Sequence, residues 1–289
     1  MLRILKYLIP AVIISIIILH GPFETDEPAA SPEDHAKEDL SRVVYPSTRS
    51  IRWKPLFIRP QDTLENLYGK DWEHVARFNR IDRRHVYPGM TIKSPLNIDQ
   101  IKDYTPMPRE YEPARRYSRY ILVNMEEQWL GAYENGILKF SFPAATGRNG
   151  YETPTGIFRV DARHKNHTSS LYKTEDETTQ YPMDYAIRFY IGADNVAYWI
   201  HARDLPGRPA SHGCVGLYDE AMQKRIFTVP EKPVLQDSKR LYDWAVGENR
   251  YGPDSGNIEL LENGPIVEII GKNPEYLAKP PRHAEIPPS

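Results

Sequence analysis

The stretch that decides the fold is Arg119–Gly147, RYILVNMEEQWLGAYENGILKFSFPAATG. Apolar and polar residues alternate along it, which is typical of strands with one buried face, and Glu134-Asn135-Gly136 supplies the residues of a tight hairpin turn. Similar segments follow, at GIFRVDAR, YAIRFYIG, VAYWIHAR and GPIVEIIG. Short strands separated by turns predict a mainly β domain, an antiparallel sandwich or barrel, over residues 119–271.

Composition narrows the class of protein. The chain has 289 residues and a formal net charge of −2, so it lacks the basic surface that binding to nucleic acid requires. Its 26 prolines argue against long helices and for strands, turns and extended connectors. Because there is one cysteine, no internal disulfide can form.

The first 21 residues, MLRILKYLIPAVIISIIILHG, join Arg3 and Lys6 to an apolar run from Tyr7 to Leu19. This order is typical of a secretory signal, and the run is short for a membrane helix, which needs about 20 apolar residues. No small-x-small cleavage site follows it, so the segment is either a cleaved signal peptide or an uncleaved anchor in the inner membrane. Both interpretations predict an exported protein of the periplasm or cell envelope.

Three segments lack the apolar residues of a core. Residues 22–52 are acidic and rich in Ala and Pro, residues 96–118 are rich in Pro and charge, and residues 272–289 end in KPPRHAEIPPS. Chains of this composition bury too little surface to fold alone. We therefore expect a linker, a connector and a disordered tail, respectively.

Residues 53–95 have the pattern of a small α+β module. Leu56-Phe57-Ile58 is typical of a strand, Asp62-Thr63 of a helix N-cap, and Trp72-Asn79 of a second helix. Pro88-Gly89 marks a turn before a closing strand. The predicted order is strand, helix, helix, strand.

This order resembles the LysM module, which binds glycans that contain N-acetylglucosamine. The matching residues are Asp62-Thr63-Leu64, Asn79 and Pro88-Gly89-Met90, whereas Gln61 stands where the family usually has glycine. The resemblance implies that the module holds the protein on glycan strands. Two alternatives remain: a cap that binds no glycan, or a unit that packs over the catalytic cleft and shapes it.

The lone thiol lies in PASHGCVGLYDEAM, residues 209–222, and Cys214 follows the strand residue His201 by 13 positions. A thiolate is a strong nucleophile, and a histidine within hydrogen-bond reach can take the thiol proton. Gly213 permits a sharp backbone turn that would aim amides at a developing oxyanion. From spacing alone, a nucleophile and a buried structural cysteine are equally good interpretations.

Three ordered blocks resemble the YkuD-type L,D-transpeptidase catalytic domain. They are PAATGRNGYETPTGIFRV (143–160), YPMDYAIRFY (181–190), and Ile200-His201 followed by Ser211-His212-Gly213-Cys214-Val215. The resemblance implies a YkuD-like β-sandwich or barrel and a cysteine acyl transferase that acts on peptidoglycan stem peptides.

Residue by residue, the resemblance implies that Cys214 attacks the carbonyl of the third residue of a tetrapeptide stem and expels D-alanine. His201 is then the general base, and His212 orients the site or tunes the thiolate. The amides of Gly213 and Cys214 would form the oxyanion hole. Ser211 either holds His212 by a hydrogen bond or is a plain turn serine.

The sequence departs from the family two positions after the cysteine, where Gly216 replaces the usual arginine. A guanidinium there could bind a substrate carboxylate or brace the loop. Arg203 and Arg208, between the histidine and the cysteine, are candidate substitutes or else solvated loop residues. Tyr185, in the second block, is a further candidate for substrate binding, together with Ser211.

The resulting hypothesis is a peptidoglycan L,D-transpeptidase that forms 3-3 cross-links or attaches proteins to the cell wall. Its predicted partners are stem peptides, glycan strands and a wall-attached protein as acceptor. The alternatives are a carboxypeptidase or endopeptidase that hydrolyses the same stems, and a non-catalytic wall protein. We expect no cofactor and no metal, because His201, His212 and Cys214 lack the spacing of zinc motifs.

Overall fold

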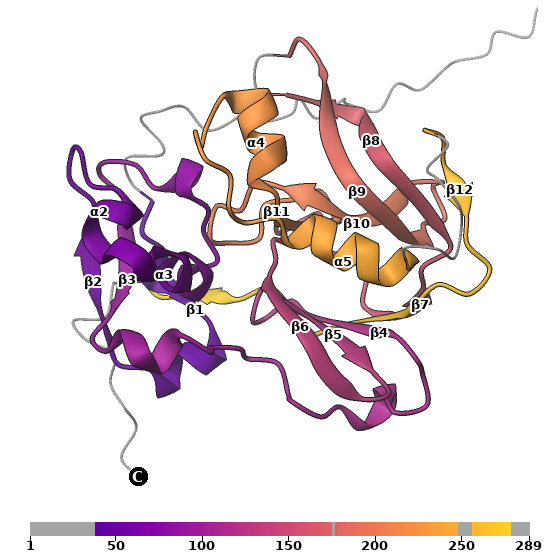
Figure 1. The fold of residues 1–289 in the computed structure, drawn as a ribbon, viewed down its shortest axis with the longest axis horizontal. Helices are drawn as coiled ribbons and strands as arrows, with labels where there is room; N and C mark the ends of the chain where they lie inside the picture. The colour runs from indigo at the N-terminus through magenta and orange to yellow at the C-terminus, as the bar shows by residue number, and fades with distance from the viewer. Residues whose placement is uncertain (1–37, 175–176, 248–255, 279–289) are drawn as a thin grey trace, which may run out of the picture.

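Figure 1 shows the computed structural model of the chain, which describes residues 38–174, 177–247 and 256–278. The predicted export segment at 1–21 lies outside these residues. Within them, no helix has the length and apolar character needed to cross a membrane. The helices are α2 (Leu64–Tyr68), α3 (Trp72–Asn79), α4 (Glu220–Phe227) and α5 (Asp237–Val246).

The strands before the loop that contains Cys214 are β1 (Val43–Val44), β2 (Trp53–Phe57), β3 (Thr91–Pro95), β4 (Tyr120–Asn124), β5 (Trp129–Glu134), β6 (Ile137–Pro143), β7 (Gly156–Arg159), β8 (Ala162–Lys173), β9 (Gln180–Ile191) and β10 (Ala197–Arg203). Those after it are β11 (Val215–Tyr218), β12 (Glu259–Leu260), β13 (Ile266–Ile270) and β14 (Glu275–Tyr276). Short 3-10 turns connect several of them, at Leu40–Arg42, Pro46–Ser50, Gly69–Asp71, Arg83–His85, Ile98–Ile101 and Glu112–Ala114.

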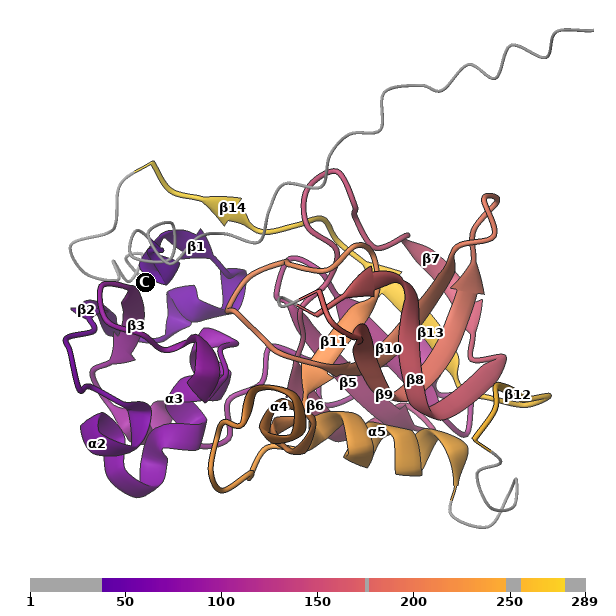
Figure 2. The same cartoon turned by 90° about the horizontal axis from the view of Figure 1, so that it is seen from above.

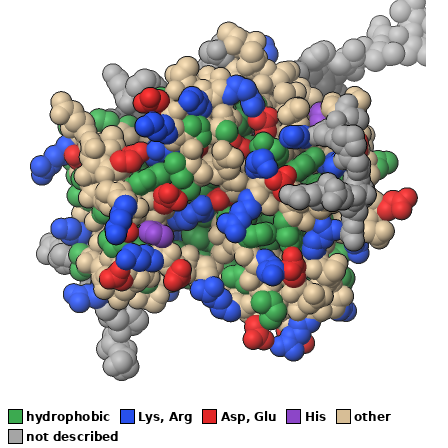
Figure 3. Space-filling view, in the orientation of Figure 1, with side chains coloured by type: hydrophobic (Ala, Val, Ile, Leu, Met, Phe, Trp, Pro, Cys, Tyr) green, Lys and Arg blue, Asp and Glu red, His purple; other side chains and the backbone are tan. Residues whose placement is uncertain are grey.

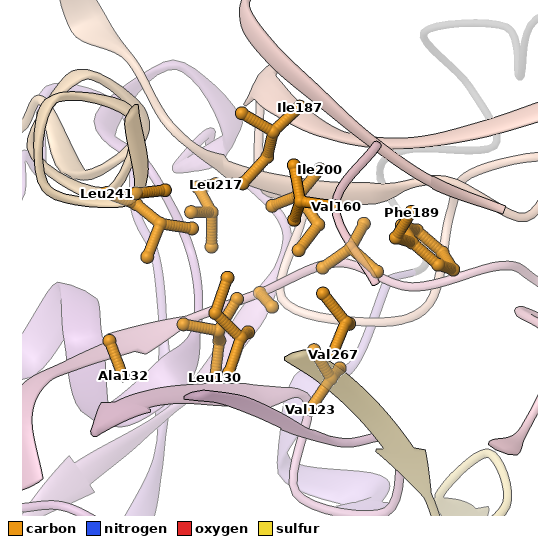
Figure 4. Close-up of a cluster of buried hydrophobic side chains, with 14 of the residues drawn as sticks. Val123, Leu130, Ala132, Val160, Ile187, Phe189, Ile200, Leu217, Leu241 and Val267 are labelled. Atoms are coloured by element: carbon orange, nitrogen blue, oxygen red, sulfur yellow. The ribbon is translucent and has the colours of Figure 1, made fainter. Parts of the chain in front are cut away.

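The domain from β4 to β13 is built on two five-stranded sheets, with strand orders β6-β5-β4-β13-β7 and β11-β10-β9-β8-β12. Their facing side chains form one core, and Figure 4 shows Val123, Ile200 and Val267 there, with Leu241 of α5 next to Leu217. The predicted mainly β class is confirmed. The expectation of purely antiparallel sheets is wrong, because β13 pairs in parallel with β4, and β11 in parallel with β10.

The hairpin predicted at Glu134-Asn135-Gly136 joins β5 and β6. Asn135 and Gly136 both adopt positive φ, of 49° and 84°. A two-residue turn with positive φ at both positions matches the right-handed twist of the strands, and it favours Asn-Gly. Local sequence therefore determines this connection.

Residues 53–95 form the predicted strand–helix–helix–strand unit, in which β2 and β3 pair antiparallel. The Thr63 hydroxyl caps α2 by accepting from the amide of Asn66 at 3.1 Å. The Asn79 side chain donates to the Lys93 carbonyl and accepts from the Lys93 amide, both at 2.8 Å, which ties α3 to β3. Gln61, at the position usually held by glycine in LysM modules, adopts φ 73°.

This N-terminal unit packs directly on the β4–β13 domain, as Figure 2 shows. The Tyr218 hydroxyl of β11 donates to the carbonyl of Ile81 at 2.8 Å. Arg77 and Arg83 make bidentate ion pairs with Asp237 and Glu220. The structure thus shows residues 53–95 packed against the β4–β13 domain.

Two expectations about unfolded segments are wrong where the structure describes them. Within the expected 22–52 linker, Leu40, Val43 and Tyr45 are at most 2% exposed in the core of the N-terminal unit. Within the expected 272–289 tail, β14 pairs antiparallel with β1. The two segments therefore supply each other with a paired strand, although neither has the composition of a segment that folds alone.

Residues 96–118, expected to be a connector, also pack against the β4–β13 domain. Met107 and Ala114 are buried against Tyr120 and Tyr133 on the outer face of the β4–β5 sheet. Elsewhere, Figure 3 shows basic and acidic side chains interspersed on the face viewed, in keeping with the net charge of −2.

Candidate active site

The parallel pairing of β10 and β11 brings the predicted nucleophile and base to one face of a sheet. His201 lies opposite Gly216, and Ile200 opposite Val215, so Cys214 lies level with Trp199. Paired residues point to the same face and successive residues alternate, so the His201 and Cys214 side chains are diagonal neighbours. The Trp199 amide lies 3.4 Å from the Cys214 sulfur and donates to it.

The turn before Cys214 is closed by Ser211. Its hydroxyl donates to the Cys214 carbonyl at 2.5 Å and accepts from the Gly213 amide at 3.1 Å. Ser211 is therefore a turn serine and does not bond to the His212 ring. The Gly213 amide, predicted for the oxyanion hole, already donates to Ser211 within this turn. Of the two amides predicted for the hole, the Cys214 amide is therefore the one available to an oxyanion.

Gly213 is required by conformation and by space. It adopts φ 111°, and a Cβ there would lie 2.5 Å from the Tyr198 ring. A left-handed backbone and a close aromatic neighbour both exclude larger residues. This explains the glycine in front of the nucleophile.

The block Ala145-Thr146-Gly147 positions the nucleophile turn from the other sheet. Ala145 exchanges backbone hydrogen bonds with Gly216, at 2.9 and 3.0 Å, and the Thr146 carbonyl accepts from the Ser211 amide at 3.1 Å. A Cβ at Gly147 would lie 1.9 Å from the Tyr151 carbonyl, so that position also requires glycine. The first sequence block thus holds the turn that contains Cys214 by backbone hydrogen bonds.

His201 is 3% exposed, and its Nδ1 bonds to the Ala202 carbonyl at 2.7 Å. Because a carbonyl only accepts, Nδ1 carries the proton and Nε2 keeps its lone pair. Burial lowers the pKa of the imidazole to about 3, against the smaller opposing effect of the Ala202 bond. His201 is therefore a neutral hydrogen-bond acceptor at physiological pH.

Cys214 is half-buried, and this raises the pKa of the thiol to about 11, although the Trp199 amide and the Arg203 charge oppose the rise. Neutral thiol and neutral imidazole therefore coexist, rather than a thiolate–imidazolium pair. No hydrogen bond joins the two side chains in the described part of the chain, and catalytic hydrogen bonds often form only in the complex with substrate.

We expect Cys214 to react slowly with iodoacetamide at pH 7, at least about 10-fold slower than an ordinary free cysteine, because little thiolate is present. The rate should rise with pH until about pH 11, where the thiol titrates. Alkylation followed by intact mass from pH 6 to 11 measures this profile. A plateau below pH 8 would contradict the neutral resting pair.

His212 lies between two tyrosine rings that are not among the site residues expected from the sequence. Tyr172 of β8 stacks on it at 4.1 Å, Tyr151 meets it edge-on at 4.7 Å, and Arg148 bonds to Nε2 at 3.1 Å. These contacts hold the His212 ring in place beside the turn that contains Cys214. Tyr151 and Arg148 fall within the first sequence block, which was the available signal.

Arg203 occupies the space left by Gly216. A Cβ at Gly216 would lie 2.6 Å from the Arg203 Cβ and 2.5 Å from its Cδ. The Arg203 guanidinium donates to the Ala210 carbonyl at 3.0 Å, and its Nε is buried without a partner. The Arg203 charge, carried by β10, acts on the Cys214 thiol and opposes the rise of its pKa.

The structure does not bring Arg208 or Tyr185 to the thiol. Arg208 pairs with Glu38 of the N-terminal segment. Tyr185, at φ 56°, packs against Tyr242 of α5 at 5.8 Å. Over residues 38–174, 177–247 and 256–278, no three His, Cys, Asp or Glu side chains gather as a metal site.

Comparison with solved structures finds several L,D-transpeptidases. The protein from Mycobacterium smegmatis is 14% identical over 53% of this chain and 59% of that chain, at a TM-score of 0.35. Those from Stackebrandtia nassauensis and Xylanimonas cellulosilytica are 19% identical, over 71% and 68% of this chain and 68% and 78% of theirs, both at 0.37. Similarity at these TM-scores does not bear on function, and this chain spans about three fifths of the mycobacterial one.

The sequence comparisons differ in outcome. No curated protein matches the chain. Residues 118–258 match the family model YkuD, the L,D-transpeptidase catalytic domain. β13 lies beyond the matched residues but completes the same sheet. Residues 118–258 are therefore similar to the YkuD-type L,D-transpeptidase catalytic domain.

Proposed function

We propose that the protein is an exported peptidoglycan L,D-transpeptidase that forms 3-3 cross-links between stem peptides. The observation that carries this proposal is the diagonal placement of Cys214 and His201, with the His201 tautomer fixed by the Ala202 carbonyl. The family match to residues 118–258 supports the class of reaction.

In the first half-reaction, the Cys214 sulfur attacks the carbonyl carbon of the third stem residue while His201 Nε2 takes the thiol proton. The two pKa values lie far apart in the unliganded protein, so the proton moves in step with C–S bond formation. The Cys214 amide stabilises the oxyanion. When the C–N bond breaks, His201 returns the proton to the amine of D-alanine, and a thioester remains.

In the second half-reaction, a side-chain amine of a neighbouring stem attacks the thioester carbonyl and gives one proton to His201. Collapse breaks the C–S bond, and the proton returns to the thiol. A protein amine in the same place would attach that protein to the wall. Water in the same place would make the enzyme a carboxypeptidase or endopeptidase, the second candidate function.

The third alternative, a non-catalytic wall protein, is the weakest. Its main support is the missing arginine at Gly216, and the aliphatic stem of Arg203 fills that space while its guanidinium donates to the Ala210 carbonyl. We further propose that residues 53–95 contact glycan strands while packed on the enzyme, and that the N-terminus directs the chain to the periplasm.

The proposed function is tested by incubating the protein with sacculi and with soluble tetrapeptide muropeptides, followed by mass spectrometry of the products. We expect 3-3 linked dimers and free D-alanine. Tripeptides without dimers would identify a hydrolase, and unchanged muropeptides would contradict both enzymatic candidates.

The Arg203–Gly216 pair predicts a coupled effect. Gly216→Arg should lower turnover by about 10-fold or more, because its Cβ meets Arg203 side-chain atoms well inside contact distance, and overpacking of this kind costs about 1–3 kcal/mol. The swap Arg203→Gly with Gly216→Arg should recover most of the loss, since glycine at 203 removes the obstructing atoms. Melting temperature and kcat/KM of both single variants and the swap measure the coupling. Additive losses would contradict it.

A further inference from the structure

The loop from Asp204 to Pro209 connects the strand of the base to the turn of the nucleophile, and the N-terminal unit holds it. Two hydrogen bonds join Asp82 to Leu205. The Asp82 amide donates to the Leu205 carbonyl at 2.9 Å, and the Asp82 carboxylate accepts from the Leu205 amide at 2.6 Å. Leu205 is fully buried in the core of the N-terminal unit.

A second anchor holds the middle of the loop. The Tyr45 hydroxyl donates to the Gly207 carbonyl. Gly207 has φ 85°, and a Cβ there would lie 2.5 Å from Leu40 and 3.1 Å from the Asn79 carbonyl. The loop backbone is thus pressed between elements that all lie before residue 96.

Asp82 is the centre of this contact. It is fully buried, and its carboxylate also accepts from Gln223 of α4 at 2.9 Å and from the His85 ring at 2.9 Å. One carboxylate therefore links the loop, a helix of the catalytic domain and the N-terminal unit. A buried carboxylate with this many donors holds a single geometry, because any displacement leaves polar groups unpaired.

We propose that Asp82 is a positioning residue for the acyl transfer: acting from the N-terminal unit through the Asp204–Pro209 loop, it sets the placement of Cys214 relative to His201. This inference rests on the proposed function for its kinetic consequence only. A small misplacement of the reacting groups lowers the rate by about 100-fold. A residue that holds the loop in place can therefore change the rate strongly without touching the substrate.

The test compares Asp82→Asn with Asp237→Asn. Asp237 is a matched control because it is 4% exposed at the same interface and pairs with Arg77 at 2.6 and 2.9 Å. None of its hydrogen bonds in the described part of the chain reaches the loop. We expect kcat on a soluble tetrapeptide to fall about 10-fold or more in Asp82→Asn, with KM within about twofold, and to change little in the control.

Alkylation of Cys214 gives a readout that needs no turnover. Displacement of the loop should admit water to the thiol, so the apparent pKa of alkylation should fall from about 11 toward that of a free cysteine in Asp82→Asn but not in Asp237→Asn. Tyr45→Phe, which removes one hydroxyl, should give a smaller shift in the same direction, and it replaces Asp82→Asn if that variant does not fold.

Equal effects of Asp82→Asn and Asp237→Asn on kcat and on alkylation would overturn the proposal. If the wild-type protein turns over no tetrapeptide, the proposed function fails, and the alkylation profiles alone then decide whether Asp82 positions Cys214.

Discussion

Replacing Cys214 with alanine is expected to abolish turnover of tetrapeptide muropeptides while leaving the fold intact. The substitution removes the sulfur that forms the thioester, and no other cysteine exists in the chain. The only hydrogen bond lost is the weak one from the Trp199 amide, so the free energy of unfolding should change by less than about 1 kcal/mol. Product analysis by mass spectrometry and a thermal melt measure the two quantities.

Two companion variants separate chemistry from structure. Cys214→Ser keeps the size of the side chain but offers a hydroxyl with a much higher pKa, so it should also be inactive. His201→Gln should reduce the rate by about 10²–10⁴-fold, the usual contribution of a general base. Turnover by Cys214→Ala within about 10-fold of the wild type would remove Cys214 as the nucleophile.

The parts of the site that the sequence predicted are those carried by contiguous residues. Ser211 to Cys214 form one turn, and the alternation of VAYWIHA places His201 on a strand, so a motif and a periodicity were sufficient. The role of Ser211 was left open, because whether its hydroxyl reaches the His212 ring or its own turn depends on backbone dihedrals that no sequence pattern specifies.

The features of the fold and of the site that could not be predicted from the sequence depend on the pairing of distant segments. That Arg203 fills the space at Gly216 follows from the register in which His201, two residues before Arg203, lies opposite Gly216. The 22–52 segment was predicted as a linker because its average composition is polar. The few apolar residues after position 38 are buried by partners as far away as Gly207 and Tyr276.

Arg80 is the clearest example of a residue whose position could not be predicted from the sequence. An arginine at the end of a helix is ordinarily solvated, yet Arg80 is 0% exposed. Its guanidinium lies 3.9 Å from the Tyr45 ring centroid and 5.0 Å from that of Trp129, and it pairs with Glu127 at 3.2 Å. Glu127 and Trp129 belong to the catalytic domain, so this side chain joins the two units.

Arg80→Met is therefore expected to cause the largest loss of stability among single substitutions at the interface between the units. Methionine keeps much of the buried volume but leaves Glu127, whose side chain is 7% exposed, as an uncompensated charge. Removing one partner of a buried ion pair typically costs about 3–5 kcal/mol. Urea unfolding at pH 7 should show a midpoint lower by about 1 M or more with an unchanged slope.

A double variant and a surface control identify the cause. Adding Glu127→Gln to Arg80→Met should restore part of the stability, because the unpaired charge is gone while the amide oxygen can still accept from Ser47, as the carboxylate does now. Lys102→Met, which removes an exposed pair with Asp99, should leave the midpoint near that of the wild type. If Arg80→Met and Lys102→Met unfold at the same urea concentration, the ion pair does not hold the units together. A chain that begins near Arg109 would then be expected to fold and to turn over soluble substrate, whereas a large loss in Arg80→Met predicts that such a chain is unstable.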